Sequence, residues 1–229
     1  MEQPPVSTAS QTAAPRSTDS AAVVAGLKRA IDRGELVPNQ RLVEADICAE
    51  FHASRATVRA ALAELTLEGL VERIQNRGAR VRAVAVEEAV EITEVRAALE
   101  AICAAKAAEQ VTDEDVQELQ ALGEAMSQAV AAGDLLRYSD LNKTLHRRVV
   151  ELSRHETAAA LIARLRGQSV RFQFRLAMQP GRPAVSLPEH LEILDAVCAK
   201  DPERAAAAME KHLTSVANAI TRAAEDPGR

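Results

Sequence analysis

Four polar side chains in the second half of the chain have the types and spacing of a metal site. They are Asn142, His146, His190 and His212, and each falls on the apolar face of a segment with helical periodicity. A polar group on such a face is costly to bury unless it is paired or binds a ligand. Asn142 and His146 are four residues apart, so an amide oxygen and an imidazole stack on one helix face.

The hairpin expected between the last two helices places His190 and His212. His190 precedes Lys200 by ten residues, and His212 follows Pro202 by ten. At about 1.5 Å per residue, each imidazole lies roughly 15 Å from the turn, so the two are level in an antiparallel pair. Three imidazoles and one amide oxygen would then converge from three helices.

This ligand set favours a divalent metal, zinc first, with nickel, manganese or iron as alternatives, and it leaves positions open for water or a carboxylate. The alternative is three core histidines that pair with the backbone or with one another and hold no ion. For any one histidine alone that alternative is the better interpretation, whereas three level imidazoles beside Asn142 favour the metal. His155, near an expected loop, is interpreted as structural.

The composition predicts a mainly α-helical protein. The chain has 229 residues, 47% of them apolar, and it is rich in alanine, the best helix former. No apolar stretch approaches the roughly 20 residues needed to cross a bilayer, and the first residues lack the layout of a secretory signal. We therefore expect no membrane association and a cytoplasmic location. The three cysteines are far apart and are expected to be reduced thiols.

The net charge of −5 argues weakly against a nucleic-acid binder, but the charge is unevenly placed. Residues 21–86 carry ten Lys and Arg against eight Asp and Glu, whereas residues 87–229 carry seventeen against twenty-three. A basic front on an acidic body is compatible with DNA binding through the front alone.

The spacing of apolar residues and the positions of helix starts and breaks divide the chain into three parts. Residues 1–20 have no apolar period and are expected to be a disordered tail. Residues 21–84 predict a winged helix-turn-helix, with helices near 21–33, 44–51 and 54–68 and two strands within 71–84. Residues 85–229 predict an all-helical bundle with six helices at about 88–109, 113–131, 134–152, 156–179, 186–198 and 202–224. Ser186 is interpreted as a helix start and Pro183 as a break.

The helix that begins at Ser54 is expected to lie in the major groove of DNA. Its first turns carry Ser54, Arg55, Thr57 and Arg59, which suit contacts with guanine and phosphate. The strand turn beyond contains further arginines, and its candidate DNA-binding residues are Arg77 and Gly78. For an isolated helix, solvated surface charges would be the better interpretation of these arginines.

The stretch GELVPNQRLVEADICAEFHASRATVRAALAELTLEGLVERIQNRGARV resembles the amino-terminal domain of GntR-type bacterial transcription regulators. In that family, G-x-L-x-P-G-x-x-L-x-E precedes a V-S-R-x-P-V-R-E-A-L helix, then L-x-x-x-G-L-V and a wing with R-G-x-x-V. Asn39 and His52 stand where the pattern has glycine, Ala53 where it has valine, Thr57 where it has proline, and Ala60 where it has glutamate. The resemblance implies DNA binding by this part of the chain.

The second half resembles the FCD effector-binding domain of the FadR branch of that family, in its shorter VanR-like form. The motifs are EVRAALEAICAAKA, NKTLH, EHLEILDA, and the run from Asp201 through Met209 to His212. Many members have aspartate where this chain has Asn142, and an amide is the weaker metal ligand. The resemblance implies that a small organic acid binds beside the metal, with Arg96, Arg171 and Arg175 as candidate effector-binding residues.

The leading hypothesis is a ligand-responsive transcription regulator, with repression relieved by effector as the commoner family mode. A homodimer on a near-palindromic operator is expected, because one winged helix makes few contacts. The first alternative is a metal-dependent hydrolase. It is weakened because Glu189 points about 100° away from the adjoining His190 and no His-Glu-x-x-His run exists. The second is a helical interaction module, for which Arg55 and Arg59 would be dispensable.

Overall fold

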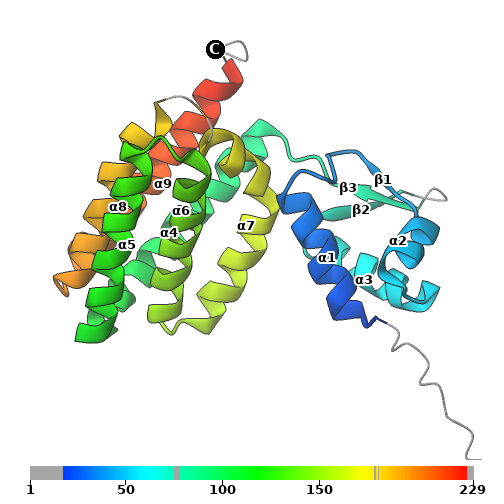
Figure 1. The fold of residues 1–229 in the computed structure, drawn as a ribbon, viewed down its shortest axis with the longest axis horizontal. Helices are drawn as coiled ribbons and strands as arrows, with labels where there is room; N and C mark the ends of the chain where they lie inside the picture. The colour runs from blue at the N-terminus through cyan, green and yellow to red at the C-terminus, as the bar shows by residue number, and fades with distance from the viewer. Residues whose placement is uncertain (1–17, 75–77, 178, 180, 226–229) are drawn as a thin grey trace, which may run out of the picture.

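The computed structural model describes residues 18–74, 78–177, 179 and 181–225. Two bodies lie side by side, a small one containing all the described strands and a larger one made of helices (Figure 1). We call the first, from α1 to β3, the head, and the second, from α4 to α9, the bundle. This is the mainly α fold that the sequence predicts.

The head is a winged helix-turn-helix in which a three-stranded antiparallel sheet has the order β1-β3-β2. Strand β1 was not expected, because a two-residue strand carries no readable alternation. Its pairing with β3 places Arg41 opposite Arg80. The elements of the head are α1 (Ser20–Asp32), β1 (Arg41–Leu42), α2 (Glu44–Phe51), α3 (Arg55–Leu67), β2 (Val71–Ile74) and β3 (Gly78–Val81).

The three head helices share one apolar core. Val23 and Leu27 of α1 lie against Val58, Leu62 and Leu65 of α3, and all five side chains are buried. These residues recur at helical spacing on each helix, so the opposite face of α3 remains in solvent. The core therefore fixes which residues of α3 can reach a partner.

Six helices form the bundle within the described part of the chain. They are α4 (Val86–Gln110), α5 (Asp113–Ala131), α6 (Leu135–Leu152), α7 (Glu156–Ala177), α8 (Arg182–Cys198) and α9 (Pro202–Glu225). No helix among the described residues is long and apolar enough to cross a membrane.

Helix α8 corrects one expectation from the sequence. It begins at Arg182, not at Ser186, and Pro183 lies in its first turn instead of breaking the chain. A proline in the first turn loses no helical hydrogen bond, because the amide it lacks would have no partner there. The earlier start places Ser186 inside the helix, where its side chain is buried.

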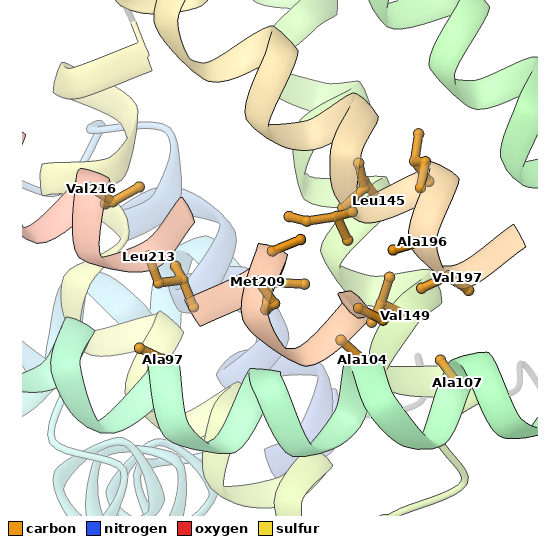
Figure 2. Packing of buried hydrophobic residues seen from close by; sticks show 14 of the residues in the cluster. Ala97, Ala104, Ala107, Leu145, Val149, Ala196, Val197, Met209, Leu213 and Val216 are labelled. Carbon is orange, nitrogen blue, oxygen red and sulfur yellow. The ribbon is translucent and has the colours of Figure 1, made fainter. Parts of the chain in front are cut away.

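Helices α4 and α9 run alongside each other through the centre of the bundle (Figure 2). Helix α4 presents the small side chains Ala97, Ala104 and Ala107, and α9 presents Met209 and Leu213. Small residues on one helix allow the larger side chains of the other to fill the contact. Residues of α6 and α8 cover the same core from the other side, and Figure 2 labels Leu145, Val149, Ala196 and Val197.

The head and the bundle meet at α7, which faces α1 in Figure 1. Gln168 of α7 donates from Nε2 to the backbone oxygen of Glu68, the C-cap of α3, at 2.7 Å. Lys28 of α1 pairs with the Glu68 carboxylate at 2.6 Å. Only residues 82–85 separate β3 from α4. The bundle therefore holds the carboxyl end of the helix expected to enter DNA.

Replacement of Gly69 tests this contact. Gly69 has φ +76°, and an added Cβ would lie 2.5 Å from Nε2 of Gln168. Gly69→Ala should cost about 1–2 kcal/mol of backbone strain and about 0.5–1.5 kcal/mol for the displaced hydrogen bond. Urea unfolding gives the free energy.

The matched control is Gly133→Ala, because Gly133 has φ +69° and nothing within 4 Å of an added Cβ. It should show the strain alone. In a Gln168→Ala background, Gly69→Ala and Gly133→Ala should lower the free energy of unfolding by the same amount. An equal cost in the wild-type background would show that Gln168 does not constrain Gly69.

Candidate functional site

Three histidines from three helices converge in the bundle. His146 lies on α6, His190 on α8 and His212 on α9, and each is at most 3% exposed. One ring nitrogen of each lies within 4.8 Å of the others. The ring centroids of His190 and His212 are 4.3 Å apart, which agrees with the level placement expected from the hairpin.

The imidazoles border a small cavity of about 50 Å³. Asn142, one turn before His146 on α6, lines the same cavity. Arginine side chains from α4, α7 and α8 also line it, and these are Arg96, Arg166 and Arg182. The structure thus gathers the four candidate metal ligands around one space.

A buried carboxylate orients His146. Glu100 of α4 accepts from Arg96 at 2.6 Å through Oε1 and contacts Nδ1 of His146 at 2.6 Å through Oε2. Burial alone would raise the pKa of Glu100, but the charge of Arg96 and the contact with His146 hold it well below its usual range. The carboxylate is therefore ionised and can only accept, so His146 donates from Nδ1 and keeps a lone pair on Nε2.

Glu189 does the same for His212. Its Oε2 lies 2.9 Å from Nδ1 of His212, and Arg182 lies 3.6 Å from the same oxygen. Burial would raise the pKa of Glu189, yet the hydrogen bond with His212 and the nearby Arg182 lower it overall. The ionised carboxylate accepts the Nδ1 proton and leaves Nε2 of His212 unprotonated.

A chain of hydroxyls orients His190. Ser186 donates to the backbone oxygen of Arg182 at 3.1 Å, so its only proton is used. Tyr138 must then donate to Ser186, at 2.8 Å, and its oxygen must accept from Nδ1 of His190, at 2.9 Å. Nε2 of His190 consequently carries a lone pair.

Burial also keeps the three imidazoles neutral. It lowers the pKa of His146 to about 4 despite the opposing charge of Glu100. Burial lowers the pKa of His190 well below its usual value, and that of His212 as well. Neutral imidazoles are the form that binds metal, so no proton has to be expelled near pH 7.

Unpartnered polar atoms accumulate at this cavity. Among the described residues, Nε2 of His190, Oδ1 of Asn142, Nη1 of Arg96 and Nη2 of Arg182 are buried without a hydrogen-bond partner, and all four residues line it. The nitrogen and the amide oxygen offer lone pairs that suit a divalent cation. The two guanidinium nitrogens offer protons that suit an anion. The residues present therefore fit a metal that carries an anionic ligand.

Several residues of this site were missed by sequence reasoning. Glu100 carried a signal, because it lies four residues after Arg96 on a predicted helix. Glu189 was considered only as a base toward His190, but it reaches His212 across the hairpin. Arg182 carried no signal, since it preceded the expected start of its helix. The side chains of the candidates Arg171 and Arg175 lie outside the described residues.

Four of the proposed DNA-contacting residues lie at the start of α3, and their side chains are exposed or half-buried. Ser54 caps the helix by accepting from the backbone nitrogen of Thr57 at 3.1 Å. Arg55 is exposed and has no ion-pair partner among the residues that the structure describes. Arg59 is exposed but pairs with Glu44 of α2 at 2.9 Å. Of the two arginines on α3, Arg55 is therefore the one without an acidic partner among the described residues.

The wing is less basic in effect than its sequence suggests. Arg80 pairs with Glu72 on the neighbouring strand at 2.5 Å, and Arg82 pairs with Glu88 of α4. The exposed Gly78 opens β3 with φ +89°, a conformation that favours glycine. Arg77 lies outside the described residues.

Comparison with known families accounts for both halves of the chain. Residues 19–81 match the bacterial regulatory proteins of the gntR family, and residues 91–215 match the FCD domain. The chain belongs to the GntR family of transcriptional regulators. This GntR-family regulator carries its FCD domain in the bundle, where the histidines converge.

Named relatives are regulators, not enzymes. A probable D-xylose utilization operon transcriptional repressor of Paenarthrobacter nicotinovorans is 30% identical over 187 residues, which is 81% of each chain. LutR of Bacillus subtilis is 29% identical and covers 83% of this chain and 96% of its own. The solved structure of Escherichia coli McbR/YncC has the same fold, with a TM-score of 0.76 at 23% identity over 89% of this chain and 97% of its own.

Protein kept in a chelator should lose stability as the pH falls from 7 to 5. A histidine in the unfolded chain titrates near 6.5, whereas His146 titrates at about 4 in the fold. Between those values the unfolded chain binds more protons, so this contribution is complete above about pH 6.5 and declines below it. Urea unfolding at constant ionic strength measures the slope.

The variant His190→Leu should flatten that slope, because one buried imidazole no longer resists protonation. His155→Ala, which lies outside the cluster, serves as the matched control and should keep it. Equal stability of the wild-type protein at pH 7 and pH 5 would contradict the buried neutral state of the cluster.

Proposed function

We propose that this GntR-family protein is a repressor that binds operator DNA as a homodimer and responds to a small organic acid in a metal-containing pocket of its FCD domain. The convergence of three imidazoles, each with its Nδ1 engaged, carries the sensing part of the proposal. Membership of the family carries the DNA-binding part.

His146, His190 and His212 would hold the metal through Nε2, with Asn142 supplying the oxygen. Zinc is the metal we propose, because nitrogen-rich sets of this kind suit it. The bound metal would supply a Lewis-acid position for a carboxylate. Glu100 and the other Nδ1 partners would fix the rings, as is usual for metal-bound histidine.

The effector would carry a carboxylate, because two guanidinium groups at the cavity each keep one nitrogen without a hydrogen-bond partner. Nη1 of Arg96 and Nη2 of Arg182 are both buried and unpaired by hydrogen bonds among the described residues. The cavity volume of about 50 Å³ holds about three to five waters and so admits a metal and a carboxylate group, not a large molecule. Arg96 was a candidate from the sequence, and Arg182 joins it on geometry.

Hydrolysis is not supported by this site. Hydrolysis by a metal-bound water usually relies on a general base that is free to take a proton. Glu100 and Glu189, the carboxylates hydrogen-bonded to the cluster, are both engaged in holding imidazoles and paired with arginines. The arrangement supports binding of an acid, in agreement with the regulators among its relatives.

Response to an effector would reach DNA through the contact between the bundle and the head. Gln168 of α7 holds the C-cap of α3, and Arg166 on the same helix lines the metal cavity. An acid that favours one position of α7 would therefore favour one placement of the two heads of a dimer.

Removal of Arg55 tests the placement of α3 in the major groove. Arg55→Ala should weaken binding to a DNA site selected from a random library by about 5- to 150-fold, which corresponds to about 1–3 kcal/mol for a lost base contact. Fluorescence anisotropy gives the affinity. The matched control is Arg137→Ala, an exposed arginine of the bundle. Unchanged affinity of Arg55→Ala would reject this surface.

Removal of His190 tests the metal site. His190→Ala should lose most of its bound zinc in elemental analysis and lose the stabilisation by acetate in thermal unfolding, since one ligand and its fixed geometry are gone. DNA binding without effector should persist. His155→Ala should retain both zinc and response, and an unchanged zinc content in His190→Ala would exclude the proposed ligand set.

A further inference from the structure

A larger cavity lies between the head and the bundle. It has a volume of about 560 Å³, the size of a pocket for a small organic molecule. Its walls come from α1, the end of α3 and the turn that follows, α6 and α7. Its apolar lining consists of Leu70, Val150, Ala159, Ala160, Ile162 and Ala163, with Gly167 beside them.

This interdomain cleft adjoins the metal cavity. Asn142 and Arg166 line both spaces, so these two side chains form the wall between them. Oδ1 of Asn142 has no hydrogen-bond partner, and no hydrogen bond joins the guanidinium of Arg166 to any other described residue. Arg166 interacts with Glu100 through charge alone. The wall is therefore held by few directional contacts.

The charge of the cleft favours an anion. Five cationic side chains but only two acidic ones line it. Three of the cations are already paired, Lys28 with Glu68, Lys143 with Asp140 and Arg147 with Glu151. Arg164 and Arg166 form no ion pair within 4 Å in the described part of the chain. A negatively charged molecule with an apolar body matches two arginines without ion pairs beside an apolar lining.

We propose that the interdomain cleft is the binding site for the apolar body of the effector, whose carboxylate reaches the metal cavity past Asn142 and Arg166. The effector class is then a monocarboxylic acid with an apolar chain of several carbons. This inference rests on the proposed function, because the carboxylate end requires the metal site.

A ligand in the cleft would contact the head directly. Leu70 belongs to the turn that follows α3, and its Cδ2 would lie 3.4 Å from a Cβ added at Gly167 of α7. A ligand there touches both bodies at once, beside the hydrogen bond between Gln168 and Glu68. The apolar body is thus the part of the effector that senses the position of the head.

A series of straight-chain acids tests the proposal. Zinc-loaded protein is titrated by calorimetry with acetate, butanoate, hexanoate and octanoate, each below its micelle concentration. Affinity should rise by about fourfold for each CH₂ that becomes buried. The same affinity for acetate and octanoate would overturn the cleft as a ligand site and leave the metal-bound carboxylate intact.

A second experiment fills the cleft with larger side chains. Ala163 and Ala160 are exposed positions on α7 that line the cleft but not the metal cavity, so Ala163→Phe and Ala160→Phe should fold. Both variants should bind acetate as the wild type does, but their affinity should no longer rise with the chain length of the acid. Ala121→Phe, at an exposed alanine of α5, is the matched control and should keep the gain.

The outcomes separate the two proposals. A gain with chain length that persists in both filled variants would place the chain elsewhere and overturn this inference. Failure of zinc-loaded protein to bind any acid would overturn the proposed function itself. A crystal structure of the octanoate complex with the hydrocarbon chain against Leu70 would establish the site.

Discussion

The bundle is organised around three imidazole lone pairs that face one another in a space shielded from water. Each ring is oriented by a hydrogen-bond partner at Nδ1. This partner is a carboxylate for His146 and His212 and a phenol for His190. Three such lone pairs repel one another unless a cation or a donor comes between them. The remainder of the bundle has to supply partners that keep this arrangement in place.

Those partners come from elements far apart in the chain. Glu100 lies on α4, 46 residues before His146, and Tyr138 lies 52 residues before His190. Helices α4 and α9 approach each other over alanines of α4 (Figure 2), and Glu100 of α4 reaches the cluster through His146 of α6. Removal of a single partner would leave a buried charge or hydroxyl unpaired, so the cluster and the helix packing depend on each other.

The sequence predicted the parts of this arrangement that follow from helix geometry. The spacing of Asn142 and His146, and the equal distances of His190 and His212 from their hairpin, depend only on residues per turn. Which side chains meet across helices depends on how each helix is rotated in its packing, and this is why Glu100 was missed. Strand β1 was missed because its pairing with β3 is a tertiary contact.

The head was predictable for a different reason, since its motif has a fixed order of turns and caps. Asn39 and His52 stand where the family pattern has glycine, and both have positive φ, 65° and 50°. Both residues therefore adopt the left-handed conformation that glycine favours, although neither is a glycine.

Helix α7 links the metal cavity to the head through two side chains on its opposite sides. Arg166 and Gln168 are two residues apart, which is about 200° around a helix, so one side chain is directed to the interior and the other to the neighbouring body. A roll of α7 about its own axis cannot move one without moving the other in the opposite sense. The contact with the head and the lining of the metal cavity therefore cannot shift independently of each other when this helix turns.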